Sequence, residues 1–152
     1  IRQQPLFTAY SEGWALYAEL LAKEMGMYKD DPLGDLGRLQ AEIFRAARLV
    51  VDTGIHAKGW SREKAIEYMV GVTGMAETDV TTEIERYMSI PGQACAYKVG
   101  QLKFLALREK ARQALGNRFD LKAFHKVILE SGAVPLTVLE RLVDDWIART
   151  KA

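Results

Sequence analysis

The sequence holds one cysteine, Cys95, so it has no internal disulfide framework. In the segment QACAYK this residue is interpreted as a small buried hydrophobe rather than a reactive thiol. No apolar run reaches about 18 residues, so no transmembrane helix is predicted. The 21 basic and 20 acidic side chains give a net charge of +1, which argues against a dedicated nucleic-acid-binding surface. These absences leave a 152-residue protein that depends on its own apolar core.

The first residues, IRQQPLFTAY, contain neither the hydrophobic region of a signal peptide nor an initiator Met. We therefore expect the chain to be a fragment or a processed product of a longer protein. Nothing in the sequence assigns it to the cytoplasm or to an exported compartment.

Signatures of a self-contained active site are missing as well. Gly54 and Gly59 have the spacing of a phosphate-binding loop, but Trp60 stands where that loop needs a lysine. Neither His56 nor His125 follows a glutamate at the di-iron spacing, and His125 is interpreted as a structural helix residue. No His-Glu-x-x-His, Cys-x-x-Cys or Gly-x-Ser-x-Gly occurs. The sequence therefore predicts no complete zinc site or serine nucleophile.

Helical periodicity dominates the chain, and no strand alternation or repeat is evident. Ser61 and Asp120 stand where N-caps are expected, and Thr78 or Asp79 is a further candidate cap. The pattern predicts an all-α fold, an irregular bundle of about seven helices in a single domain, 1–152. The expected helices cover residues 8–25, 33 to 51 or beyond, 62–72, 80–89, 93–115, 121–130 and 136–150.

The first expected helix raises the main functional question. Glu12, Glu19 and Lys23 share a face opposite the stripe expected to be buried, so a solvated face with a Glu19–Lys23 pair is one interpretation. Two features argue against it: the flanks of this face are apolar, and Gly13 weakens the helix. A glycine beside a carboxylate is useful where another backbone or a ligand approaches closely. The stripe expected to be buried comprises Tyr10, Trp14, Tyr17, Leu21 and Met25.

Two further places carry candidate site residues. Asp52 lies four residues before His56, so a continuing helix would let the carboxylate hold the imidazole; a helix-end histidine is the alternative. Tyr87 and Tyr97 flank an Ile-Pro-Gly break that can aim a phenol into a cleft, but the pattern alone favours two half-buried tyrosines with satisfied hydroxyls. Arg86 is either a substrate anchor or a surface charge.

Four segments together resemble one known family. YSEGWALYAE, RAARLVVDTGIHAKGWSREKAI, RYMSIPGQACAYKVGQLKFLALREKA and FDLKAFHKVILESGAVPLTVLERLVDDWI are similar, in this order, to the C-terminal part of the bacterial domain-of-unknown-function family 885 (DUF885). The resemblance covers nearly the whole chain. That family in turn resembles zinc metallopeptidases of the gluzincin type.

The resemblance implies roles for individual residues. EGWA is similar to the segment that supplies the third zinc ligand of related aminopeptidases, so Glu12 is implied as a metal ligand. Glu19 and Asp52 are implied as residues that support the site without binding the metal. His56 and Tyr97 are implied as catalytic groups that stabilise an oxyanion. Three protein ligands would leave a position for a water, which zinc activates to hydrolyse a peptide bond.

Tyr87 and Arg86 are implied as contacts to a peptide substrate. The chain departs from the family because the His-Glu-x-x-His-like motif is missing. We therefore expect zinc in the full-length protein only, with the remainder of the same polypeptide as partner, and an isolated chain that is inactive. The competing hypothesis is a non-catalytic helical domain that binds peptides or proteins.

Overall fold

The computed structural model describes residues 7–152, which contain helices and no strands. This confirms the all-α prediction of about seven helices. No helix in this range is long and apolar enough to cross a membrane. The α-helices are α1 (Thr8–Glu24), α2 (Pro32–Lys58), α3 (Arg62–Thr73), α4 (Glu77–Ser89), α5 (Ala96–Leu115), α6 (Leu121–Glu130) and α7 (Leu136–Lys151), with 3₁₀ turns η1 (Gln93–Cys95) and η2 (Gly116–Arg118).

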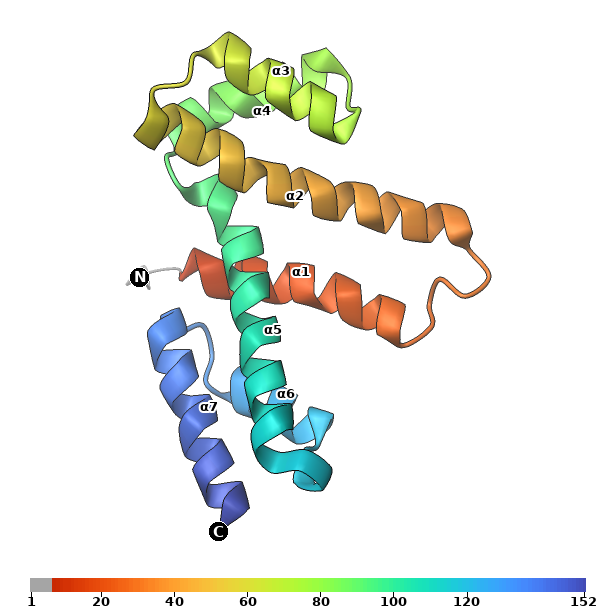
Figure 1. The fold of residues 1–152 in the computed structure, drawn as a ribbon, viewed down its shortest axis with the longest axis vertical. Coiled ribbons are helices and arrows are strands. Elements are labelled where there is room, and N and C mark those ends of the chain that lie inside the picture. The colour runs from red at the N-terminus through yellow and green to blue at the C-terminus, as the bar shows by residue number, and fades with distance from the viewer. Residues whose placement is uncertain (1–6) are drawn as a thin grey trace, which may run out of the picture.

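The helices are arranged around a hairpin and a crossing (Figure 1). α1 and α2 run antiparallel, one beside the other, joined by the loop after α1. α3 and α4 cover the C-terminal half of α2, while its N-terminal half extends beyond them. α5 crosses α1 steeply, and α6 and α7 pack near the far end of α5.

Local signals account for several helix ends. The Ser61 hydroxyl accepts a hydrogen bond from the Lys64 N–H at 3.2 Å, and the Asp120 carboxylate accepts one from the Ala123 N–H at 2.7 Å. Both predicted caps are therefore confirmed. Gly26, which follows the C-cap residue Met25 of α1, has a φ of +83°, as expected of a glycine that ends a helix.

The structure settles one helix end and corrects another helix start. The sequence left the end of the second helix open, at Val51 or beyond, and α2 continues to Lys58. Gly54 is required inside this helix because Trp60 packs on it: a Cβ there would lie 2.7 Å from the indole ring. The Trp60 N–H also donates to the Gly54 carbonyl at 3.0 Å. α4 begins at Glu77, so neither of the polar residues expected to cap it does so.

Two apolar clusters hold the helices together. The α5 core lies among α1, α5, α6 and α7, and the α2 core lies among α2, α3, α4 and η1. Met25, expected to be buried, is 80% exposed because α1 has ended before it. The buried members of the α5 core are Tyr10, Tyr17, Phe104, Leu107, Ala111, Leu115, Phe124, Ile128, Leu139, Val143 and Ile147; those of the α2 core are Val51, Ala65, Ile66, Met69, Val80, Ile84, Tyr87 and Ala94.

The crossing of α1 and α5 is made by two glycines. A Cβ on Gly13 would overlap the backbone of Gly100, and a Cβ on Gly100 would overlap the carbonyl of Ala9. The close approach that Gly13 suggested is therefore an approach of another backbone. The residue before it, Glu12, is carried on a helix whose position is fixed by this contact.

Candidate functional site

Glu12 lies one residue from the α1–α5 crossing and is half-buried. Within residues 7–152 its carboxylate makes no hydrogen bond or ion pair. Since Glu19 is seven residues further along the same helix, both side chains project from one side of α1. A half-buried carboxylate without a partner is unusual, because burial favours pairing.

The other charges on this side of α1 have partners on α2. The Lys23 ammonium pairs with the Asp35 carboxylate, and Glu19 lies 3.8 Å from the guanidinium of Arg45. The predicted Glu19–Lys23 pair is therefore replaced by contacts between helices. Periodicity did not indicate these partners because they come from a different helix.

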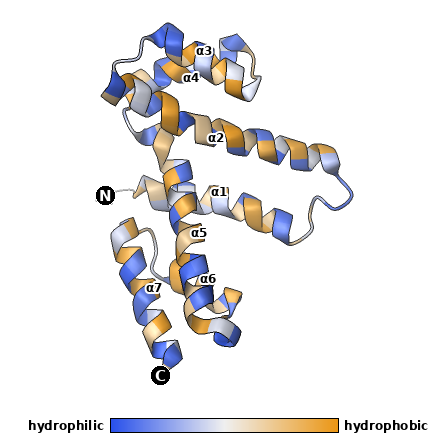
Figure 2. Cartoon of the chain, viewed as in Figure 1, coloured by the Kyte–Doolittle hydropathy of each residue, from blue (hydrophilic) through white to orange (hydrophobic). Residues whose placement is uncertain are grey.

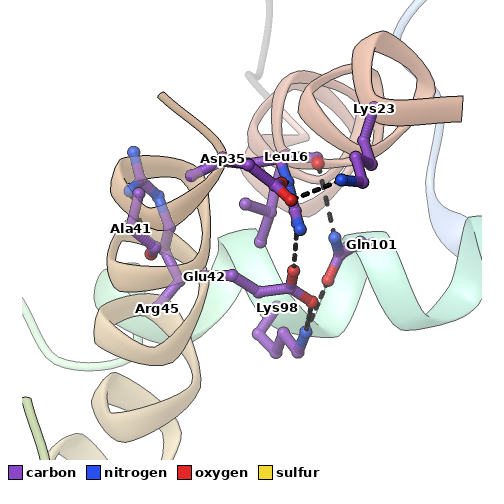
Figure 3. Close-up of polar contacts among 9 residues, drawn as sticks. Leu16, Lys23, Asp35, Ala41, Glu42, Arg45, Lys98 and Gln101 are labelled. Atoms are coloured by element: carbon purple, nitrogen blue, oxygen red, sulfur yellow. Dashed lines mark hydrogen bonds and ion pairs between the residues drawn. The ribbon is translucent and has the colours of Figure 1, made fainter. Parts of the chain in front are cut away.

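An ion-pair network, here called the charged seam, fills the space between α1, α2 and α5 (Figure 3). Arg38 bonds both Asp35 at 2.9 Å and Glu42 at 3.0 Å. Lys98 of α5 donates to Glu42 at 2.9 Å and to Gln101 at 2.7 Å. The hydrogen bond from Lys98 is the main reason that the pKa of Glu42 is lowered. The network ends where the Gln101 amide donates to the Leu16 carbonyl of α1 at 3.3 Å.

A second polar group, here called the Arg48 cluster, joins α2 to α4. It comprises Arg48, Glu83, Arg86 and Tyr87. The buried Arg48 guanidinium donates to the Tyr87 hydroxyl and to the Glu83 carboxylate, both at 2.8 Å. The Tyr87 hydroxyl in turn donates to Glu83 at 2.8 Å, and Arg86 donates to the same carboxylate oxygen at 2.8 Å.

The cluster shifts the acidity of its members. Burial alone would raise the pKa of Glu83, but hydrogen bonds from Arg86 and Tyr87 and the charge of Arg48 outweigh it and lower that pKa to about 2. The pKa of Tyr87 is raised, chiefly by burial. At neutral pH the cluster therefore holds a charged Glu83 and a neutral phenol.

Arg48 and Glu83 were not predicted from the sequence. The four-residue spacing of Glu83 and Tyr87 does place them on one helix face, which was a usable signal. Arg48 gave no comparable signal, because its partners lie more than 30 residues away.

Tyr87 and Arg86 were predicted to bind substrate. Tyr87 is fully buried and its hydroxyl is used within the Arg48 cluster. Arg86 is bound to Glu83 and, at 3.2 Å, to the Gln93 side chain. The hydroxyl of Tyr87 is thus satisfied inside the chain, as its alternative interpretation had it, and Arg86 is an ion-paired side chain of α4. Their substrate roles stay predictions.

Tyr97 differs from Tyr87. It is half-buried at the start of α5, and its hydroxyl makes no hydrogen bond within the described range. The guanidinium of Arg48 lies 5.1 Å from the centre of its ring and that of Arg45 lies 5.7 Å away. The Nε atom of Arg45 is buried without a partner in the described part of the chain. Tyr97 thus combines a free hydroxyl with two neighbouring cations.

Asp52 and His56 do not pair with each other. The buried Asp52 carboxylate accepts the Gly92 N–H at 3.0 and 3.1 Å and so holds the turn before η1. Burial and then the charge of Asp52 raise the pKa of the nearby Cys95 to about 11, which keeps its thiol protonated. His56 reaches the Tyr87 carbonyl instead, with its Nε2 at 3.0 Å. A neutral His56 therefore carries its proton on Nε2 and leaves Nδ1 as an acceptor.

The structure thus places five of the predicted residues around the C-terminal half of α2, and the two glutamates on α1. Among residues 7–152, no group of three or more histidine, cysteine, aspartate or glutamate side chains could hold a metal ion. The described residues therefore do not fit a complete zinc site. At most, Glu12 offers one carboxylate of such a site.

Comparison with known proteins identifies the family. A family model described as "Bacterial protein of unknown function (DUF885)" matches residues 1–143. The crystal structure of "the putative lipoprotein from Colwellia psychrerythraea" matches with a TM-score of 0.91 and 62% identity, over 93% of this chain and 24% of that chain. "A putative lipoprotein of unknown function from Shewanella oneidensis" matches with a TM-score of 0.83 and 29% identity, over 88% and 24%. No curated protein matches. The chain thus spans about a quarter of the length of these solved relatives.

Proposed function

Because this chain belongs to the DUF885 family of bacterial proteins of unknown function, we propose that it is the helical part of a zinc-dependent peptidase-like hydrolase. Its contribution is Glu12, one of three protein ligands to the metal. The two histidine ligands and the general base come from polypeptide outside residues 1–152. The observation that carries the proposal is the half-buried Glu12 carboxylate, which has no partner within residues 7–152.

The surroundings of Glu12 suit a carboxylate that binds a metal ion. A metal ligand needs a carboxylate that is free of protein cations and held in one position. The glycine crossing at Gly13 and Gly100 supplies the fixed position. Glu19, on the same side of α1, lies near Arg45 and is the natural control. Zinc would supply an activated water in such an enzyme.

Tyr97 is the second group that the proposal uses. Its phenol is expected to donate a hydrogen bond to the carbonyl oxygen of a bound peptide, and the two guanidiniums beside it favour the negative charge that develops there. His56 differs from Tyr97 in the hydrogen bonds that it can make. With Nε2 bonded to the Tyr87 carbonyl, its neutral form accepts at Nδ1, and only its protonated form donates to an oxyanion.

The alternative is a helical domain that binds peptides without cutting them. The engagement of Arg86 and Tyr87 inside the chain supports it, since two groups expected to hold substrate are already occupied. The sequence of the complete polypeptide separates the two hypotheses. An intact His-Glu-x-x-His-like motif favours the peptidase, and substitutions at its ligand positions favour the binding domain.

The proposal is tested in a hybrid protein. This chain replaces the matched quarter of the Colwellia relative, to which it is 62% identical. Glu12→Gln is compared with Glu19→Gln by zinc content, by cleavage of a peptide library and by thermal melting. We expect Glu12→Gln to lose zinc and cleavage without losing the fold, and Glu19→Gln to keep its zinc and its fold. Equal zinc content in both variants would contradict the proposal.

A further inference from the structure

α2 carries an apolar stripe that no described residue covers. The α2 stripe comprises Leu36, Leu39, Ile43 and Val50, which are 61%, 49%, 42% and 36% exposed. Leu36, Ile43 and Val50 are spaced by seven residues, and Leu39 lies three residues after the first. This is the spacing of a seam along which two helices pack side by side. A solvated helix face would carry polar residues at these positions.

The stripe borders an open groove. A pocket of about 560 Å³ is lined by Leu36, Leu39, Gln40, Ile43, Val72 and Thr73. A second pocket of about 280 Å³ adjoins it through Gln40 and is lined by Gly37, Gln40, Ala41, Phe44 and Met75. A Cβ on Gly37 would meet open space, so this glycine is not explained by packing inside the chain. Gly37 and Ala41, one turn apart, allow another backbone to come close.

The groove lies where α2 runs past its neighbours. Figure 2 shows apolar segments recurring along α2 into the half that α3 and α4 leave uncovered. Val72 and Met75, near the end of α3, form one side of the groove. The groove is therefore lined by residues of α2 on one side and by Val72 and Met75 on the other.

We propose that a helix from the remainder of the same polypeptide lies along the α2 stripe in the longer DUF885 proteins. The occupant is assigned from chain length: the solved relatives share this fold, yet the matched segment is only 24% of each. Three quarters of those chains thus lie outside the described helices. The heptad spacing selects a helix as the occupant, packed about 8–10 Å from α2. The inference holds whether or not the protein binds zinc.

Photo-crosslinking in the hybrid protein tests the occupant. The residue p-benzoylphenylalanine replaces Leu39, the protein is irradiated, and the crosslinked peptides are identified by mass spectrometry. The expected product is an intramolecular crosslink from position 39 to a segment outside this chain. A crosslink between two copies would assign the stripe to a dimer, and the absence of any protein crosslink would leave the stripe exposed; either result overturns the proposal.

A pair of matched variants gives a second readout. Leu39→Glu is compared with Leu129→Glu on α6, because the two leucines are 49% and 52% exposed. In the isolated chain we expect neither variant to shift the melting midpoint. In the hybrid we expect Leu39→Glu to lower it clearly more than Leu129→Glu does. Equal shifts in the hybrid would show that the stripe is not buried there and would overturn the proposal.

Discussion

α1 packs against two helices, α5 and α2, through different kinds of contact. Toward α5 it packs two glycines and aromatic side chains, so that the backbones touch at Gly13 and Gly100. Toward α2 it faces the charged seam, where side chains bridge a wider space. Close packing of backbones holds α1 against α5, and ion pairs between side chains hold α1 against α2. Glu12 is held by the rigid contact and projects from the polar side, a combination that suits a ligand-binding carboxylate.

The largest effect is expected at the glycine crossing. Gly100→Ala places a Cβ against the Ala9 carbonyl, so we expect a loss of about 3 kcal/mol or more in the free energy of unfolding. Gly37→Ala is the control, because its Cβ meets open space in α2 and alanine favours a helix by about 0.5–1 kcal/mol. Urea unfolding of both variants measures the difference. Similar stability of the two would mean that the crossing is not closely packed.

A smaller effect is expected at the Arg48 cluster. The folded-state pKa of Glu83 is about 2, below its ordinary value of 4.5, so its contribution is present above about pH 4.5 and is lost as the pH falls toward 2. Screening at this partly exposed carboxylate limits the contribution to on the order of 1–2 kcal/mol. Glu83→Gln should remove it at pH 7 and flatten the acid dependence. Unfolding curves at pH 7, 4 and 2.5 test this, and an unchanged pH slope would contradict it.

The charged seam is expected to contribute less and to depend on salt. Glu42→Gln removes the carboxylate shared by Arg38 and Lys98, which should cost about 0.5–1 kcal/mol at low ionic strength. The difference from the wild-type chain should shrink in 1 M NaCl, where charges are screened within about 3 Å. Urea unfolding at two salt concentrations measures it. A loss that is the same at both would show that packing, rather than charge, joins α2 to α5 at this point.

The smallest effect is expected from zinc on the isolated chain. A single carboxylate does not hold the ion firmly, since structural and catalytic zinc sites use three or four protein ligands. Calorimetric titration of the 152-residue chain should show no stoichiometric site of submicromolar affinity. Such a site would contradict the assignment of the other ligands to polypeptide outside this segment.

Structural features that depend on residues close together in the sequence could be predicted. Periodicity and caps such as Ser61 and Asp120 depend on neighbours within one turn, and the structure has them as predicted. The sequence did not explain Gly54, because the Trp60 ring that packs on it is brought back onto the helix by the turn after α2. The DUF885 resemblance likewise depended on ordered segments and is confirmed over residues 1–143.

Side-chain partners were harder to predict. One interpretation paired Lys23 with Glu19 on its own helix, but Lys23 pairs across the hairpin with Asp35. Asp52 was matched to His56 by spacing, yet it binds the Gly92 N–H, 40 residues away. Such pairs follow from tertiary packing, which a single sequence does not specify. The proposed partners of Glu12 lie beyond the segment altogether, so its role stays a prediction.

The most direct test of the account is the position of zinc relative to Glu12. Crystals of the hybrid protein grown with zinc would be measured at the zinc absorption edge, where anomalous scattering locates the metal. The account predicts a peak about 2.0–2.2 Å from a Glu12 carboxylate oxygen, with the remaining protein ligands outside this chain. A bound zinc that does not contact Glu12 would contradict it.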